Sequence, residues 1–338
     1  MAAARDPLAL MGVEVVPLTP VHVDASVRVL AAARDSLLRI EPVLGEGLPD
    51  PSVSREIIAA TVDSGPAFLA LREGDGVGFL AGTVRSHGGS RLAHTRLHQH
   101  AVDASDRRDI VRRLYEAMAR RVTAIGCFRH QIDVAVADAL AVQTWFELGF
   151  AVDQIKGVRA CDAVGFTGAD VKVRSAGPGD LDKLIALAVD LARFHASPPM
   201  LAPVFLDALA ISRDMEEALQ KEDATILVAV DGDVNLGMMQ VHPDGSMPRV
   251  ATIGMAMVAN GQRSRGVGSA ILAEVLEWAR NLGYQHCAVG WTSANPLSDR
   301  FWRSRGFKPV RYSLARQIDE RVSWANADLK GEDILRPW

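Results

Sequence analysis

The chain has 338 residues and a mass of 36.4 kDa, which is about twice the usual size of one domain, so two domains are expected. Hydrophobic residues make up 49% and charged residues 23%, with 28 Gly and 16 Pro, which excludes a disordered or fibrous chain. A net charge of −4 offers no basic face for nucleic acid. Cys127, Cys161 and Cys287 lack metal-ligand spacing, so neither a disulfide framework nor a metal site is expected, and the cytoplasm is the expected location. No signal peptide and no membrane span are expected.

The first half of the chain predicts an α/β unit. Val13-Glu14-Val15 opens a strand, and a long helical pattern follows Pro20. PAFLALREGDGVGFLAGTV then predicts two strands joined by a Gly/Asp turn. VRRLYEAMARRVTAIG predicts an amphipathic helix that ends at Gly126, and a W-x-x-x-G-F pattern ends at Phe150. The small, polar segment 160–170 is the expected link to the second half.

The second half repeats this order of elements. Val171-Lys172-Val173 matches the opening strand, and ATILVAVDGDVNLGMMQV matches the two joined strands. GSAILAEVLEWARNLG matches the helix, and one register without gaps aligns residues 106–150 with residues 263–307. The repeat predicts two α/β domains, 1–160 and 166–338, of which the tail 320–338 has no counterpart in the first half.

A phosphate-binding turn is predicted where an apolar strand pattern ends at Val258 and the helix of the second half begins. Unpaired amides and the dipole at a helix N-terminus attract anions. Gly266 and Gly268 would allow the positive φ angles and the close backbone approach that an anion cradle requires, and Arg263 and Arg265 would add charge. A Walker loop is excluded because no lysine lies here, and a Rossmann turn is excluded because Ile271 replaces the third glycine.

The remaining pattern is R-x-x-G-x-G at 263–268, which resembles the acetyl-CoA motif of the GNAT superfamily of N-acetyltransferases. Val258 stands five residues before it, and a segment like N-x-x-A-x-x-x-Y-x-x-x-G-F runs from Asn295 to Phe307. The resemblance covers 171–319 in element order and 13–159 more faintly. It implies an α/β fold of two tandem GNAT-like domains, each a mixed, mostly antiparallel sheet flanked by helices, with an architecture similar to mycothiol synthase.

The resemblance also implies the site. The fourth and fifth strands would part, and the pantetheine arm of acetyl-CoA would pair with the backbone of 256–258, with the Val258 amide as the catalytic oxyanion donor. The pyrophosphate would rest on the amides of 265–269, and Asn295 would bind the arm as it leaves. The residues expected to bind acetyl-CoA are Ala256, Met257, Val258, Arg263, Ser264, Arg265, Gly266, Val267, Gly268, Ser269, Asn295 and Trp302.

The sequence does not single out one general acid or one general base. Trp302 stands where many members carry an acidic tyrosine, and indole is no acid at neutral pH, so the thiolate would take its proton from water or from Tyr312. The candidates for the general base are His195, His242, Asp244 and Glu216. Cys287 is expected to be a packed thiol rather than a nucleophile.

The first half is expected to have lost the cofactor. In the repeat register, Asp106, Asp109 and Val111 take the positions of Arg263, Gly266 and Gly268, and Asp138 takes the position of Asn295.

The expected activity is transfer of an acetyl group from acetyl-CoA to a small-molecule primary amine by direct attack in the second half. A non-catalytic acyl-CoA-binding sensor is the alternative. The loop 193–203 is expected to cover the acceptor pocket, and the chain is expected to be a monomer whose halves pack like the subunits of a dimer.

Overall fold

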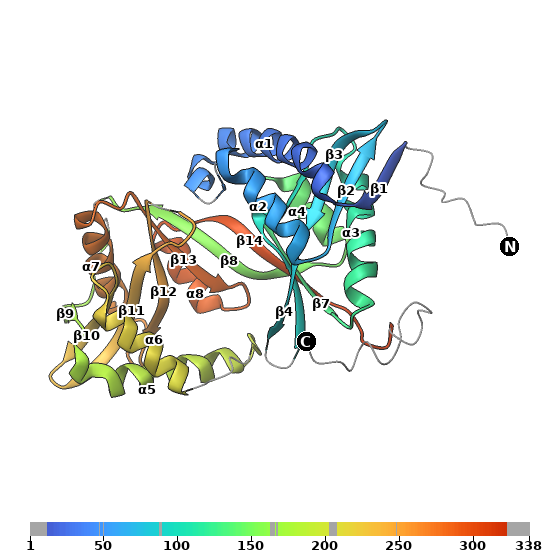
Figure 1. The fold of residues 1–338 in the computed structure, drawn as a ribbon. Helices are drawn as coiled ribbons and strands as arrows, with labels where there is room; N and C mark the ends of the chain where they lie inside the picture. Colours follow the sequence, from blue (N-terminus) through green and yellow to red (C-terminus); the bar gives the residue numbers. More distant parts are fainter. Residues whose placement is uncertain are drawn as a thin grey trace. The chain divides into compact units, whose positions relative to one another are not determined.

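The computed structural model describes residues 12–46, 48–49, 51–87, 90–162, 166, 168–202, 208–247 and 249–322. They form two compact units, one of Met1–Asp153 with Val310–Trp338 and one of Gln154–Pro309 (Figure 1). Pro203 of the expected acceptor loop and residues 323–338 of the tail lie outside the described residues.

The first unit holds two sets of paired strands and the helices that cover them. One set is antiparallel and consists of β1, β2, β3 and β6. In the other set, β5 pairs with β4 in antiparallel orientation and with β7 in parallel orientation. Its elements are β1 (Val13–Pro17), α1 (Val23–Ile40), α2 (Pro51–Ser64), β2 (Ala67–Arg72), β3 (Asp75–Ala81), β4 (Thr83–His87), β5 (Ser90–Thr95), β6 (His100–Val102), α3 (Arg107–Thr123), β7 (Arg129–Ala135) and α4 (Ala139–Glu147). Helix α3 packs on the sheet because Ile110, Leu114 and Met118 recur on one face and are buried.

The second unit is built on one sheet, in the order β8, β13, β12, β11, β10, β9. Only β12 and β13 are parallel. Its elements are β8 (Ala151–Ala160), β9 (Lys172–Ser175), α5 (Leu181–Ala196), α6 (Ala208–Gln220), β10 (Thr225–Asp231), β11 (Val234–Pro243), β12 (Val250–Val258), α7 (Val267–Asn281), β13 (His286–Thr292) and α8 (Pro296–Ser304). The mixed, mostly antiparallel sheet that the sequence predicts is therefore confirmed.

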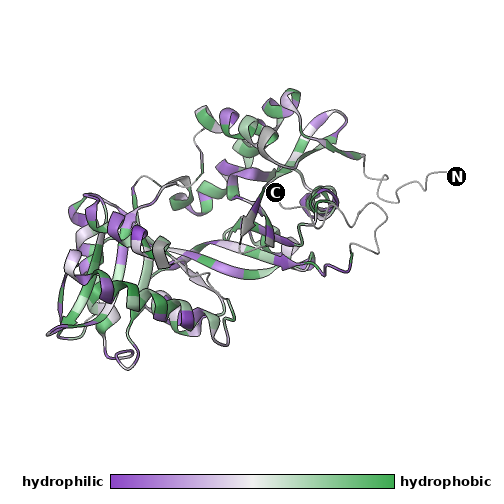
Figure 2. Cartoon of the chain, turned by 60° about the horizontal axis from the view of Figure 1, so that its bottom comes forward, coloured by the Kyte–Doolittle hydropathy of each residue, from purple (hydrophilic) through white to green (hydrophobic). Residues whose placement is uncertain are grey.

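Helices cover the sheet of the second unit by their apolar faces. Helix α7 buries Ile271, Leu272 and Val275, so the helix predicted over 268–283 is confirmed at 267–281. Leu184 of α5 and Met215 of α6 pack with residues of β10, β11 and β12 in one cluster. The helices carry both hydrophobic and hydrophilic residues along their length, as the mixed colours of their ribbons show (Figure 2).

The two sequence repeats exchange a strand. β8 follows the last helix of the first repeat, yet residues 154–160 pair with β13 of the second unit. β14 (Lys308–Gln317) follows the last helix of the second repeat, yet residues 311–317 pair with β7 of the first unit. The chain enters the second unit at 153/154 and leaves it at 309/310. The compact units therefore differ from the domains predicted at 1–160 and 166–338, which follow the repeat along the sequence.

Within the described residues, no helix is both long and apolar enough to span a membrane. The same part of the chain brings together no group of three or more His, Cys, Asp or Glu side chains that could hold a metal ion.

Candidate active site

The site starts where two parallel strands part. β12 pairs with β11 along its length, but it pairs with β13 only over Val250–Ile253. The Ala259 amide donates to the Leu236 carbonyl of β11 at 2.9 Å. Because amides alternate sides along a strand, those of Val258 and Ala256 point away from β11, into the gap beside β13. The strand edge 254–258 therefore offers backbone hydrogen bonds to an extended ligand.

In the turn after β12, one position requires glycine because its φ angle is positive. Gly266 is the N-cap of α7 with φ +85°, and a Cβ there would lie 2.8 Å from the Ala169 nitrogen. Gly268 lies inside the first helical turn, so the expectation that it takes a positive φ is wrong. Its role is steric, because a Cβ at Gly268 would lie 3.4 Å from the Phe301 ring and from Val258.

The turn presents donors and positive charge. The Ser269 and Ala270 amides donate to the Gly266 carbonyl at 3.0 Å, so the amides of Val267 and Gly268 precede the first intrahelical bond. The expectation that the Ser269 amide holds phosphate is therefore not supported by its geometry. Its hydroxyl instead accepts hydrogen bonds from Arg305, from Nη2 at 2.8 Å and from Nε at 3.1 Å.

A cavity of about 450 Å³ connects the strand edge to this turn. Arg263, Arg300 and Arg305 line it, and no aspartate or glutamate stands among its lining residues. Arginines, a helix N-terminus and open amides suit a polyanion with an extended arm. The predicted residues that line the cavity are Ala256, Met257, Val258, Arg263, Ser264, Gly266, Gly268, Ser269 and Asn295.

Three predicted residues have side chains that do not line the cavity. Arg265 is exposed and reaches Gln262 at 3.4 Å, the side chain of Val267 is buried although its amide lies at the turn, and Trp302 does not line the cavity. Asn295 lines it, but its side chain also caps α8, because Oδ1 accepts from the Ser298 amide at 3.1 Å.

Several lining residues are not among those predicted to bind the cofactor, although Phe301 and Arg305 belong to the segment from Asn295 to Phe307 and Phe194 to the loop 193–203. Phe194 stacks under Arg263, with the guanidinium carbon 4.3 Å from the ring centroid, and so orients the motif arginine. Phe301 and Arg305 are recognised only when α8 is folded against the start of α7. Leu191, Phe194, Gln262, Leu297, Ser298, Arg300, Phe301, Ser304 and Arg305 complete the lining.

Trp302 is a core residue. It is 4% exposed, and its ring meets Phe301 and Phe307 edge to face at 4.8 and 5.2 Å between centroids. We expect Trp302→Phe to keep most of the turnover, because the indole lies outside the cavity and phenylalanine keeps an aromatic ring there. The kcat of the purified variant tests this, and a thousandfold loss with the fold intact would give the indole a direct role.

Tyr312 and Cys287 are unsuited to the site. Tyr312 lies on β14, where it pairs with Val134 and packs against the core of the first unit, so the strand exchange removes it as a candidate acid for the second unit. Cys287 is 0% exposed, and burial raises the pKa of its thiol, which fits the expected packed thiol.

The corresponding turn of the first unit is closed by ion pairs. Helix α3 begins at Arg107, which the repeat aligns with Ser264, so it starts about one turn earlier than α7. Asp106 accepts from Arg72 at 2.5 Å, and Asp138 accepts from Arg107. Each carboxylate engages an arginine that could otherwise bind a phosphate.

Comparison with known proteins agrees with this geometry. Residues 194–307 match the acetyltransferase (GNAT) family. The fold is similar to a GCN5-related N-acetyltransferase from Sphaerobacter thermophilus, with 17% identity, a TM-score of 0.57, and coverage of 90% of this chain and 95% of that one. It is also similar to a tandem GNAT protein from the clavulanic acid biosynthesis pathway, with 15% identity, a TM-score of 0.53, and coverage of 90% and 98%. No curated protein matches the chain in sequence.

The parted strands, the glycine turn and the paired repeats define a tandem acetyltransferase fold. Within the second unit, residues 194–307 match the GNAT family, which supports superfamily membership, and the predicted fold of two tandem GNAT-like domains is confirmed. The match supports acyl-CoA-dependent acyltransferase activity in general.

Proposed function

We propose that the second unit transfers the acetyl group of acetyl-CoA to the primary amine of a small molecule. The observation that carries this proposal is the open edge of β12 leading into the N-terminus of α7. That edge would pair with the pantetheine arm through Ala256, Met257 and Val258. The amides of Val267 and Gly268, with Arg263 and Arg305, would hold the pyrophosphate.

The transfer would be a direct attack without an acetylated enzyme. The amine nitrogen bonds to the thioester carbon, and the carbonyl oxygen becomes an oxyanion that accepts a hydrogen bond from the Val258 or the Ala256 amide. Such a donor contributes about 3 kcal/mol in comparable sites. The attached nitrogen gives its extra proton to water as the C–S bond breaks, and the CoA thiolate takes a proton from water, because the pKa of a free thiol is about 8.5.

An assay over amine classes tests the proposal. Purified protein with acetyl-CoA should release free thiol with at least one amine of a panel of alkylamines, arylamines, amino acids and aminoglycosides. Binding of acetyl-CoA without turnover on the whole panel would instead favour a non-catalytic acyl-CoA sensor, which the position of Trp302 outside the cavity permits.

Acetyl-CoA is expected to bind once per chain. The first unit carries Arg107–Asp138 and Arg72–Asp106 ion pairs at its corresponding turn, so two carboxylates compete there with a phosphate for the arginines. Titration calorimetry should give a stoichiometry of one, and two equivalent sites would contradict the assignment.

We further propose a cytoplasmic monomer that binds neither nucleic acid nor membranes. Cys127, Cys161 and Cys287 are free and buried, as is usual in a reducing compartment. Burial raises the pKa of Cys127 and of Cys161 to about 11. The strand exchange occurs within one chain, so no second copy is needed to complete either sheet.

A further inference from the structure

A second cavity adjoins the same strand. Its volume is about 290 Å³, and it lies between α6 and the strands β11 and β12 of the second unit. Gln240 and His242 contribute from β11, and Met255, which precedes Ala256, contributes from β12. The whole lining comprises Ile211, Asp214, Met215, Glu217, Ala218, Lys221, Ala224, Gln240, His242 and Met255.

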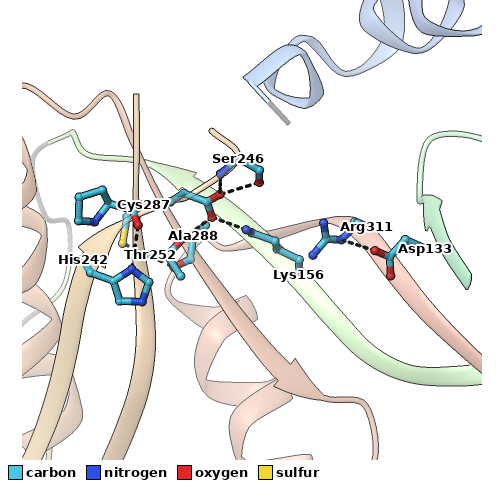
Figure 3. Close-up of polar contacts among 10 residues, drawn as sticks. Asp133, Lys156, His242, Ser246, Thr252, Cys287, Ala288 and Arg311 are labelled. Atoms are coloured by element: carbon cyan, nitrogen blue, oxygen red, sulfur yellow. Dashed lines mark hydrogen bonds and ion pairs between the residues drawn. The ribbon is translucent and has the colours of Figure 1, made fainter. Parts of the chain in front are cut away.

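His242 is held in one tautomer by its neighbour. Its Nδ1 lies 2.8 Å from the Pro243 carbonyl oxygen. Figure 3 labels His242 and draws this contact as a dashed line. A carbonyl oxygen only accepts hydrogen bonds, so Nδ1 carries the proton. In the neutral ring the lone pair is then on Nε2, which is the arrangement of a general base.

The lone pair of His242 lies over the point where β12 leaves β13. Gln240 pairs with Met255 and Val241 with Ile253, so Gly254 is the extra residue of a β-bulge. A Cβ on Gly254 would lie 2.8 Å from Nε2 of His242. The glycine therefore allows the imidazole to lie directly against the backbone of the bulge.

This position suits proton removal beside the thioester. Gly254 and Ala256 are two residues apart, or about 7 Å along a strand. An amine nitrogen between Nε2 and a carbonyl carbon needs about 3 Å on each side. Val258 is about 13 Å from the bulge by the same rise, so a base at His242 favours the Ala256 amide as the oxyanion donor.

The other candidate bases are less suitable. Burial alone would raise the pKa of Asp244, but hydrogen bonds from Lys156, Thr252 and Ser246 outweigh it and hold that pKa well below its usual range (Figure 3). Glu216 is exposed and accepts from Ser212 at 3.0 Å. Neither Glu216 nor His195 lines either cavity of the second unit described above.

The walls indicate the class of acceptor. Met215, Met255 and Ile211 give an apolar lining, whereas the acidic Asp214 and Glu217 are exposed at the rim. Lys221 lies 3.8 Å from Glu217, so its charge is partly balanced there. An apolar wall with an acidic rim attracts a cation that has an apolar body.

We propose that His242 is the general base and that the acceptor is an alkylamine with an apolar body, an inference that rests on the proposed acetyl transfer. An alkylammonium ion has a pKa near 10.4 and must lose a proton before it attacks, whereas an arylamine is already neutral. Nε2 takes that proton, the freed nitrogen attacks the thioester carbon, and the imidazolium returns the proton to solvent.

The test is the pH dependence of His242→Gln with 2-phenylethylamine as the acceptor. The variant should bind acetyl-CoA as the wild type does but lose about a hundredfold to ten-thousandfold in kcat/KM at pH 7. Its kcat/KM should then rise about tenfold per pH unit toward the pKa of the amine, because only the free amine reacts. The charged groups around the ring are Asp214 and Glu217 of α6, Lys221 directly after that helix, Asp244 and Lys156, and all are unchanged in this variant.

Three further variants separate a role in the reaction from an effect on the structure. Gly254→Ala should reproduce the loss, because the added Cβ displaces Nε2, whereas Gly245→Ala has open space around its Cβ and should not. His286→Gln, on β13 and outside both cavities, should keep the wild-type profile.

Three results would overturn the inference. The first is a His242→Gln profile that parallels the wild type or lies within threefold of it at pH 7. The second is turnover of arylamines with none of alkylamines. Absence of turnover with every amine would overturn the proposed acetyl transfer and this inference with it, whereas either of the first two results would leave the acetyl transfer standing.

Discussion

Gly268→Val is expected to abolish acetyl-CoA binding while the fold survives. Gly268 has helical backbone angles, so valine is compatible with the chain there at a modest cost in helix propensity. A Cβ at this position already lies 3.4 Å from Phe301 and Val258, and the two methyl groups of valine would fill the space between α7, α8 and the strand edge. Valine also stands at the corresponding position of the first unit, Val111.

Calorimetry with acetyl-CoA, together with circular dichroism, measures this effect. Gly179→Val is the matched control, because a Cβ on Gly179 meets open space, and it should bind acetyl-CoA with wild-type affinity. Wild-type affinity in Gly268→Val would remove the turn from the site.

A fragment of residues 166–338 is expected to fail to fold, whereas a fragment of residues 154–309 should fold and bind acetyl-CoA. The first lacks the strand that pairs with β13 from Gln154 to Ala160. Ile155 and Val158 of that strand are both 5% exposed, and losing each buried side chain costs about 1.5–3 kcal/mol. That is a large part of a typical stability of about 5–15 kcal/mol.

The packing of β8 is specific as well as apolar. A Cβ on Gly157 would lie 2.6 Å from the Trp291 ring, so only a glycine backbone fits under this indole. The fragment of residues 166–338 also carries β14 without its partner β7, which exposes Val310 and Leu314, both buried in the full chain. Gel filtration and thermal unfolding of the two fragments test this, and a soluble, monomeric 166–338 fragment as stable as the full chain would contradict it.

Local patterns made much of the fold predictable. The helix at 267–281 and the turn before it are encoded by apolar spacing and by glycines within about twenty residues. The strand exchange is not encoded locally, because β8 and β14 follow equivalent helices of two similar repeats. Either strand could pair beside β7 or β13 by its own pattern, so the choice depends on long-range packing.

The site was predictable in its backbone and less so in its side chains. The R-x-x-G-x-G turn identified most of the cavity, because anion binding there depends on amides and glycines. Arg305 and Phe301 enter through the packing of α8 on α7, which spacing does not reveal. The burial of Trp302 outside the cavity could not be predicted, because a motif position does not say which face of a helix is turned toward the core.

The exchanged strands also affect the order in which the protein is completed during synthesis. The second unit is one continuous segment, 154–309, so all its strands have been made before the chain ends. The first unit is translated earlier, but β7 receives its partner only when residues 311–317 leave the ribosome. Until then β7 has an open edge, and such edges promote aggregation during translation. The unit that is made first is thus finished last, and truncation of the last 30 residues should harm the N-terminal unit rather than the C-terminal one.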